Sequence, residues 1–338
     1  MTEIAAQLAP GIFRLVLPLG IHGVPSVNGY LLVDDAGDTL VDCGVYAPLP
    51  ERPGPDGTEA VESGLAACGR SLATLSRLVV THAHIDHFGI AGELVRRTGA
   101  DLWMHAETDR DVAKYRDAHS AVDRRTVMLA DHGLYGQLLE AASGGLMDWL
   151  PVMPTIADAT TRLRGGEQFY AGGRRWAVVH TPGHSLGHVC LWCERDGILC
   201  SGDHLLRPMA PPVTFERGFD PDPMGSYLGS LAKVVDMAPR LVLPGHGEPF
   251  ADGARRATAI ADAKRRRLDR ALSLVEAGDT TATDLTAAMF SPALTGFQLH
   301  FAMAEVLAYL AYHEARGAAE RVRRSDGVFV WRAVPGTA

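Results

Sequence analysis

The sequence lacks several features that would place it in a large class of proteins. No segment of its 338 residues approaches the roughly 20 continuous apolar residues that a membrane-spanning helix needs. The first residues, Met1 to Ala5, have neither the basic start nor the apolar run of a secretory signal. We therefore expect no membrane association and, as the default, a cytoplasmic location.

Cysteine is scarce, with five residues, an odd number without regular spacing. This excludes a disulfide framework and indicates reduced thiols. Cys190 and Cys193 form a C-x-x-C pair, but three positions apart on a strand they would point to opposite faces. We therefore predict that both are buried as small apolar side chains and form neither a redox pair nor a chelate.

A strong positive charge is also missing, because the formal net charge is −8 and the isoelectric point is about 5.9. A general nucleic-acid binder would usually be basic, so this class is disfavoured. The content of 47% hydrophobic and 21% charged residues excludes a mainly disordered chain. A chain of 338 residues is longer than a usual single domain, which predicts a main domain with an appendage.

One stretch of the chain is crowded with potential metal ligands. His82, His84, Asp86 and His87 follow directly on the apolar run Leu78–Val80. Three imidazoles and a carboxylate at a strand end would waste their burial unless a cation held them, and nitrogen and oxygen donors suit zinc or a similar metal. In an extended loop His82 and His84 point the same way, whereas Asp86 and His87 can turn towards a second ion.

Three later segments repeat this order of a short apolar strand, a small or turn residue, and a ligand type. They end at His184, Asp203 and His246. Four such strand ends in one chain predict a site for two metal ions.

These motifs resemble those of the metallo-β-lactamase superfamily, in its glyoxalase II-like branch, over roughly the first 250 residues. The resemblance implies an αβ/βα sandwich, in which helices face both outer surfaces of two sheets. It also implies seven ligands, with Asp203 bridging the two ions: His82, His84 and His184 for one metal, and Asp86, His87 and His246 for the other.

Other residues near these motifs are assigned supporting roles. Asp42 matches the buried aspartate that supports the ligand loop in this family. His188 and His204 adjoin ligand motifs, so each either orients a ligand or fills space. The five histidines away from the motifs are predicted to be ordinary hydrogen-bonded residues: His105, His119, His180, His300 and His313.

The remaining pattern predicts the catalytic domain over 1–254 and a separate module over 255–338. Expected elements of the catalytic domain are strands at 12–17, 27–33, 39–42 and 101–104 and a helix at 89–98. Residues 106–165 read as a helical insertion rich in methionine and aromatic residues. This insertion either roofs a pocket for an apolar substrate, with Trp149 and Met153 in the roof, or provides ordinary packing or a dimer contact.

The C-terminal module carries 12 basic and 9 acidic residues over 255–335, a charge of +3 that leaves −11 for the rest. Helices expected at 254–276, 283–290 and 301–316, followed by a hairpin at 319–324 and 328–332, resemble a winged helix. A subgroup of the superfamily carries such a tail, and some of its members cut single-stranded RNA. The basic run Lys264–Arg267 with Arg270 either contacts phosphates or forms a solvated face.

The function that follows is metal-dependent hydrolysis. Two divalent ions, zinc before iron or manganese, share a hydroxide that attacks the carbonyl of a small, partly apolar thioester, ester or lactone. Asp86 and Asp203 are the expected catalytic residues, with Asp86 accepting a proton. The proline-rich loop 205–212 should border the pocket, where Arg207 faces either an anionic group or solvent. The alternative function is a single-stranded RNA endonuclease; a homodimer is possible.

Overall fold

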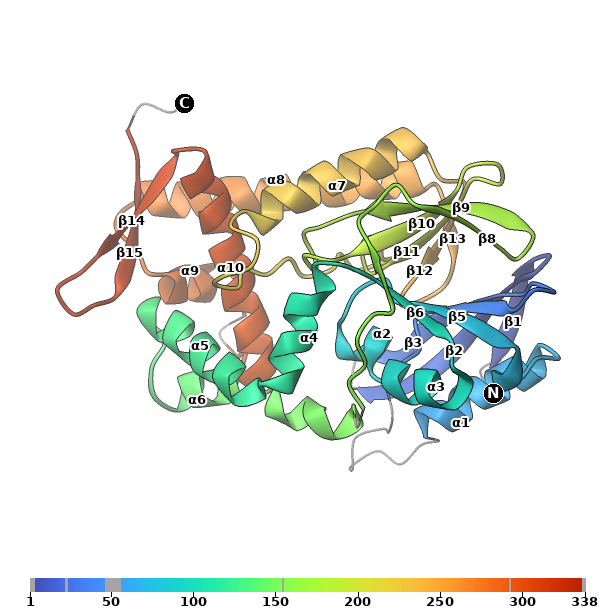
Figure 1. Cartoon of the computed structure of the whole chain (residues 1–338). Coiled ribbons are helices and arrows are strands. Elements are labelled where there is room, and N and C mark those ends of the chain that lie inside the picture. Colours follow the sequence, from blue (N-terminus) through green and yellow to red (C-terminus); the bar gives the residue numbers. More distant parts are fainter. Residues whose placement is uncertain (1–3, 22–23, 46–55, 154, 292, 336–338) are drawn as a thin grey trace.

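Two β-sheets packed face to face form the centre of the molecule, and helices cover the outer face of each sheet (Figure 1). The structure is a computed structural model that describes residues 4–21, 24–45, 56–153, 155–291 and 293–335. It confirms the predicted αβ/βα sandwich.

The first sheet contains seven strands that lie in chain order: β1 (Ala5–Ala9), β2 (Ile12–Ile21), β3 (Val24–Leu32), β4 (Asp38–Val41), β5 (Leu75–Val79), β6 (Asp101–His105) and β7 (Thr161–Leu163). The second sheet contains six strands, in the order β13 (Phe250–Ala251), β12 (Leu241–Pro244), β11 (Ile198–Gly202), β10 (Val189–Cys193), β9 (Arg174–His180) and β8 (Gln168–Ala171).

The helices of the catalytic part, in chain order, are α1 (Gly57–Ala67), η1 (Leu72–Thr74), α2 (Ile85–Phe88), α3 (Ala91–Thr98), α4 (Thr108–Arg116), α5 (Ala118–Asp131), α6 (Gly136–Gly144), η2 (Met147–Val152) and α7 (Pro223–Met237). The last part of the chain forms α8 (Gly253–Glu276), α9 (Ala282–Met289), α10 (Gly296–Ala315) and the hairpin β14 (Ala319–Arg323) and β15 (Phe329–Ala333). None of the helices in the described part of the chain is long and apolar enough to cross a membrane.

Strand alternation divides the buried side chains between the layers. Leu191 and Cys193 of β10 face the core between the two sheets, where Trp176 also lies. Cys190 faces the opposite side and packs beneath α7 with Tyr227. The two thiols therefore lie on opposite faces, as predicted. Full burial of an apolar side chain such as Leu191 contributes about 1.5–3 kcal/mol.

The strand directions place the ends of several strands at one edge. The first sheet is parallel from β4 to β7, because α1, α3 and the segment α4–α6 each carry the chain back to the start of the next strand. In the second sheet β9, β11 and β12 share one direction, since β10 is antiparallel to its neighbours. Loops at the carboxyl ends of such strands are where α/β proteins bind ligands.

Short sequence signals begin and end the helices beside these strands. α7 begins where Asp222 accepts a hydrogen bond from the Gly225 N–H and Pro223 occupies the first turn. α3 ends at Gly99, whose φ of 69° closes the last turn in the left-handed region. Leu94 of α3 is buried against the first sheet.

The insertion between β6 and β7 is helical but shorter than predicted. Its helices end at Val152, and β7 lies within the range expected for the insertion but belongs to the first sheet. Met128, Leu129 and Leu134 are buried in a core shared with α9 and α10, which agrees with ordinary packing. Met153 is buried in the catalytic core. The side chain of Trp149 lies outside the described residues.

The C-terminal part contains the predicted three helices and hairpin. α8 has 24 residues and is therefore about 36 Å long. Its first half packs against the second sheet through Ala257 and Ile260, in the same core as Val242 of β12. Its last turn, at Val275, joins the core of α9 and α10. One continuous helix thus spans the catalytic part and the C-terminal module.

Candidate metal centre

The structure brings all seven predicted ligands to one edge of the sandwich. His82 and His84 lie in the loop after β5, and Asp86 and His87 lie in the short α2 that follows. The others come from the second sheet, with His184 after β9, Asp203 directly after β11 and His246 after β12. All these positions follow the carboxyl end of a strand.

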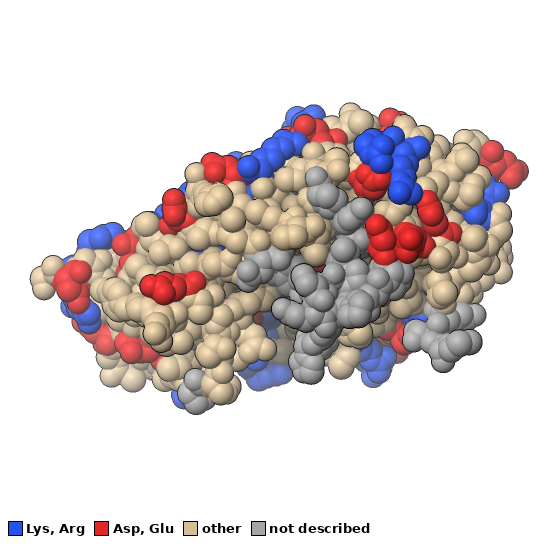
Figure 2. Space-filling model, turned by 90° about the horizontal axis from the view of Figure 1, so that it is seen from below, with Lys and Arg blue, Asp and Glu red and all other residues tan. Residues whose placement is uncertain are grey.

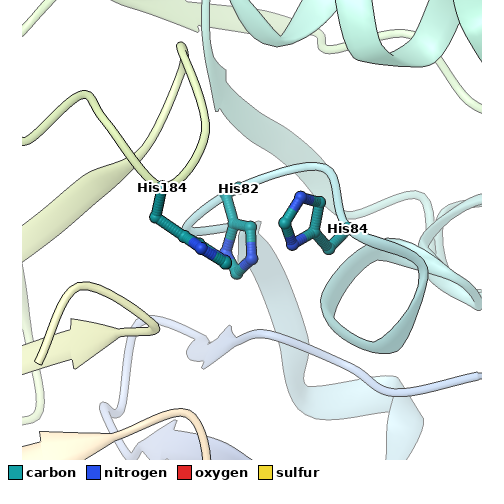
Figure 3. A group of neighbouring side chains, drawn as sticks. All are labelled: His82, His84 and His184. Carbon is teal, nitrogen blue, oxygen red and sulfur yellow. The ribbon is translucent and has the colours of Figure 1, made fainter. Parts of the chain in front are cut away.

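The first group consists of His82, His84 and His184, whose rings converge in Figure 3. Their ligand atoms all lie within 4.8 Å of one another. The ring centroids of His82 and His84 are 4.5 Å apart, and those of His84 and His184 are 4.6 Å apart. Three imidazole nitrogens at this spacing can hold a divalent ion.

The second group consists of Asp86, His87 and His246. The Nε2 atom of His246 lies 3.1 Å from Oδ2 of Asp86. Asp203 lies between the two groups, because its Oδ1 is 3.3 Å from Nε2 of His87 and its Oδ2 is 3.7 Å from Nε2 of His184. A third combination of ligand atoms, from His82, His87 and Asp203, also meets within 4.8 Å.

The outer nitrogen of several of these rings is already held by the protein. Nδ1 of His184 lies 2.7 Å from the Pro212 carbonyl, and Nδ1 of His246 lies 2.8 Å from the Ser26 carbonyl. Because a carbonyl only accepts, Nδ1 of each ring carries a proton, and Nε2 is the nitrogen that faces the site. The Nε2 atoms of His82, His87 and His184 are buried and have no hydrogen-bond partner among the residues that the structure describes. Buried atoms of this kind are costly, and a bound cation would satisfy them.

Asp42 holds the ligand loop from below. Its carboxylate accepts hydrogen bonds from the Thr81 N–H at 2.7 Å and the Thr81 hydroxyl at 2.8 Å, and its Oδ2 lies 2.8 Å from Nδ1 of His87. The backbone φ of Asp42 is 59°, in the left-handed region that few side chains adopt. A strained backbone that aims one buried carboxylate at two loop residues is typical of a functional site.

Burial and neighbouring charge separate the histidines into two electrostatic classes. Burial lowers the pKa of His82 well below its usual value and that of His84 to about 3, so both rings are neutral at pH 7. Burial also acts to lower the pKa of His246, but Asp203 and Asp86 outweigh it and raise this pKa to about 10. In the metal-free protein a proton therefore sits at the carboxylate-rich group, where an arriving cation would displace it.

The turn that carries His246 needs a residue without a side chain. A Cβ on Gly245 would overlap Oδ1 of Asp203 and lie 2.6 Å from Cε1 of His87. The same turn is tied to the first sheet, where the Asn28 N–H donates to the Gly245 carbonyl at 2.7 Å. Both sheets therefore fix the position of this ligand.

Comparison with known proteins agrees with this geometry. The family model described as the metallo-beta-lactamase superfamily matches residues 22–246, about two thirds of the chain. This chain belongs to the metallo-β-lactamase superfamily. A second model, described as the metallo-beta-lactamase-like C-terminal domain, matches residues 268–334 and so begins inside α8.

Three similar proteins each match most of the length of this chain. "Probable metallo-hydrolase YqjP" of Bacillus subtilis is 25% identical over 305 residues, which are 87% of this chain and 90% of that protein. A metallo-beta-lactamase family protein from Thermus thermophilus superposes with a TM-score of 0.82 at 27% identity, covering 97% of this chain and 100% of the other. A beta-lactamase domain protein from Burkholderia ambifaria gives 0.82 at 29% identity, covering 98% and 94%.

Membership and geometry together establish the general chemistry of this superfamily member. It is a metallo-hydrolase, and its histidine and aspartate clusters are suited to divalent metal ions.

The other histidines of this protein belong to none of the metal-binding groups that the described residues form. His188 is buried beside His82, with ring centroids 5.0 Å apart, and its Nδ1 lies 2.8 Å from the Thr181 hydroxyl. His204 packs between His188 and Tyr227. The contact of His188 with the ring of His82 is compatible with both predicted roles, orienting a ligand and filling space. The histidines predicted to have no metal role belong to none of these groups.

Two residues that were not predicted also support the centre. Asp111 of α4 accepts a hydrogen bond from the Ser185 hydroxyl at 3.2 Å, directly beside His184. Tyr115, also of α4, donates to the Ala83 carbonyl at 2.7 Å, between His82 and His84. Both come from the insertion, where the sequence carries no signal that these positions reach the ligand loop.

Arg207 and the basic run Lys264–Arg267 were each predicted either to bind an anionic group or to face solvent. Arg207 is exposed, in agreement with the solvated alternative. Within the basic run Lys264 is buried, Arg265 pairs with Asp262 at 3.1 Å, and Arg267 lies over the Phe290 ring. The run therefore does not present one continuous basic face.

Proposed function

We propose that the protein is a dinuclear zinc hydrolase of the glyoxalase II-like branch that cleaves the carbonyl bond of a small thioester, ester or lactone. The observation that carries this proposal is the position of Asp203, with one carboxylate oxygen near His87 and the other near His184 and His246. A carboxylate placed in this way can bridge two ions, one in each ligand group.

The position of each residue determines its proposed role. His82, His84 and His184 would hold one ion, and Asp86, His87 and His246 the other. When bound, such a pair makes water nucleophilic near neutral pH and polarises a carbonyl oxygen. Asp86 is the proposed proton acceptor, because its side chain is 23% exposed to solvent and its Oδ2 atom faces His246. No serine or cysteine nucleophile is required.

The preference for an acyl substrate rests on two observations. Met209 is 61% exposed on the loop whose Pro212 carbonyl holds His184, and we propose it as an adaptable apolar contact for the substrate. "Atrochrysone carboxyl ACP thioesterase" of Aspergillus terreus is 22% identical over 170 residues, which are 48% of this chain and 51% of that protein. A thioester is therefore the first substrate class to test.

The RNA alternative has less support. Its proposed contact, the basic run of α8, is divided between the core and the surface. The face in Figure 2, which lies away from α8, mixes acidic and basic side chains and shows no continuous basic surface. A small molecule is therefore the proposed partner, and single-stranded RNA is a control in the test.

The test combines elemental analysis of the purified protein with a panel of thioester, lactone, β-lactam and phosphodiester substrates. We expect two zinc ions per chain and turnover of thioesters or lactones that chelation removes and added zinc restores. An Asp86→Asn variant should keep the fold and lose turnover. Preferential cleavage of the phosphodiester, or acyl turnover that survives complete removal of metal, would contradict the proposal.

A further inference from the structure

The loop that follows Asp203 reaches both ligand groups. Its Pro212 carbonyl holds Nδ1 of His184 at 2.7 Å. Its Arg207 carbonyl lies 3.2 Å from the place of a Cβ on Gly247, the residue after His246. Residues 205–213 contain three prolines, which have no N–H to donate, so the loop cannot fix itself as a strand would. Its shape must come from other parts of the protein.

Helix α8 supplies hydrogen bonds to this loop at two points. Arg256 donates from Nε to the Leu206 carbonyl at 2.7 Å and from Nη2 to the carbonyls of Pro208 and Met209 at 2.6 and 2.8 Å. Two turns further along the helix, Nζ of Lys264 donates to the Pro211 carbonyl at 3.1 Å. The Pro211 carbonyl directly precedes the residue that holds His184.

Lys264 is itself held by the C-terminal part of the chain. Only 4% of the residue is exposed, and its Nζ lies 2.5 Å from Oε1 of Glu305 in α10. The Tyr309 hydroxyl donates to the same oxygen at 2.6 Å. Removing two charges from water costs several kcal/mol per ion, and apolar residues of similar volume often stabilise a protein equally well. Stability alone is therefore a poor reason for an ion pair at this place.

We infer that Lys264 and Arg256 are positioning residues of the metal centre, and that Glu305 holds Lys264 in place. They fix the 205–213 loop so that the Pro212 carbonyl keeps His184 turned towards the first ligand group. Through Glu305 the C-terminal module becomes a structural part of the centre. This inference rests on the proposed metal-binding role of His184, but not on any particular substrate.

A double variant, Lys264→Met with Glu305→Gln, separates positioning from stability. It removes both charges together, so neither is left unpaired in the core, and the glutamine oxygen still accepts from Tyr309. The contact between residues 264 and 305 and the hydrogen bond to Pro211 are lost together, and of these only the bond to Pro211 reaches the 205–213 loop. Arg266→Met is the matched control, since Arg266 is exposed on the same helix.

The first measurement is zinc affinity, by competition with a chelator, beside the Tm of the metal-free protein. We expect the affinity for one of two zinc ions to fall about tenfold in the double variant, the lower end of the range for groups that orient ligands. The metal-free Tm should stay within a few degrees of that of the wild type. Arg266→Met should change neither quantity.

The second measurement needs no metal. Hydrogen exchange of the amides in residues 205–214 of the metal-free protein should accelerate in the double variant and remain unchanged in Arg266→Met. A folded double variant with wild-type zinc affinity and wild-type loop exchange would overturn the inference. If the double variant fails to fold, Arg256→Gln takes its place, and unchanged loop exchange there gives the same negative answer.

The two proposals fail in different ways. Absence of acyl turnover in the zinc-loaded wild type would count against the proposed substrate and leave the affinity comparison intact. A wild type that binds no zinc would refute the dinuclear centre, and the exchange measurement would still decide whether α8 holds the loop.

Discussion

Residues far apart in the sequence meet in the metal centre, whereas neighbouring residues of the basic run of α8 lie in different environments. His82 and His184 are 102 positions apart in the chain, yet their ligand atoms meet within 4.8 Å. Lys264 and Arg266 are two positions apart, yet one is buried and the other is exposed. The first set follows the ends of strands that share one edge. Successive residues of the second set are turned about 100° around a helix axis.

This difference shows which clusters of residues in a sequence assemble one functional site in the folded protein. A motif at a strand end inherits the position of that end, so several such motifs support one another. A run of like charges on a helix is divided between the core and the surface by its own geometry. Variants at the two regions should therefore differ widely in effect.

Replacing Asp203 with alanine should have the largest effect, because its two oxygens approach ligands of both groups. We expect kcat/KM to fall by more than about a hundredfold, beyond the range for groups that only orient ligands, with loss of bound metal. Kinetics and elemental analysis on one preparation measure both. Asp236→Ala, an exposed position at the end of α7, is the control. Full activity with two ions in Asp203→Ala would contradict the bridging role.

Asp42→Asn tests the support beneath the ligand loop. Asparagine tolerates the left-handed backbone at this position, so the change isolates the carboxylate. The amide group would replace an oxygen that faces both the Thr81 hydroxyl and Nδ1 of His87. We expect zinc affinity to fall about 10- to 100-fold, measured by chelator competition. An affinity within twofold of the wild type would show that the loop holds itself.

His132 gives the C-terminal core a pH dependence of its own. Burial, with Arg321 and Arg217 nearby, lowers its pKa to about 4. An unfolded chain takes up this proton near pH 6.5, so the free energy of unfolding should fall as the pH drops from about 6.5 towards 4. By pH 5 the loss should be on the order of 2 kcal/mol.

Urea unfolding of His132→Phe at pH 7 and pH 5 measures this contribution. The ring is preserved beside Phe329 and Trp331, but the titration is removed, so the variant should lose less stability on acidification than the wild type. His119→Phe, at an exposed position, should follow the wild type. An identical acid loss in His132→Phe would assign the effect to other groups.

The smallest effect is expected at the exposed part of the basic run. Arg266→Gln with Arg270→Gln should leave acyl turnover and stability unchanged, because both residues are exposed. Neither the wild type nor the variant should bind single-stranded RNA in a salt-sensitive manner between 50 and 200 mM salt, conditions typical for such assays. Tight, salt-sensitive binding that the double variant loses would restore the RNA alternative.

The sequence alone determined that strand-end motifs carry metal ligands and that the two thiols lie on opposite faces, because strand alternation and strand-end motifs are local. The sandwich and the full set of seven residues followed from the resemblance of these motifs to the superfamily. The limits of the insertion were wrong by one strand, since β7 has only three residues and takes its place by pairing with β6.

Only the tertiary structure decided what surrounds the ligands. The carbonyls of Ser26 and Pro212 orient His246 and His184, and any residue has a carbonyl, so no residue type could have indicated them. The burial of Lys264 likewise depends on Glu305, 41 positions away on another helix. The side chain of a residue determines whether it can be a ligand. Its orientation depends on backbone atoms and long-range packing, which a local sequence pattern does not encode.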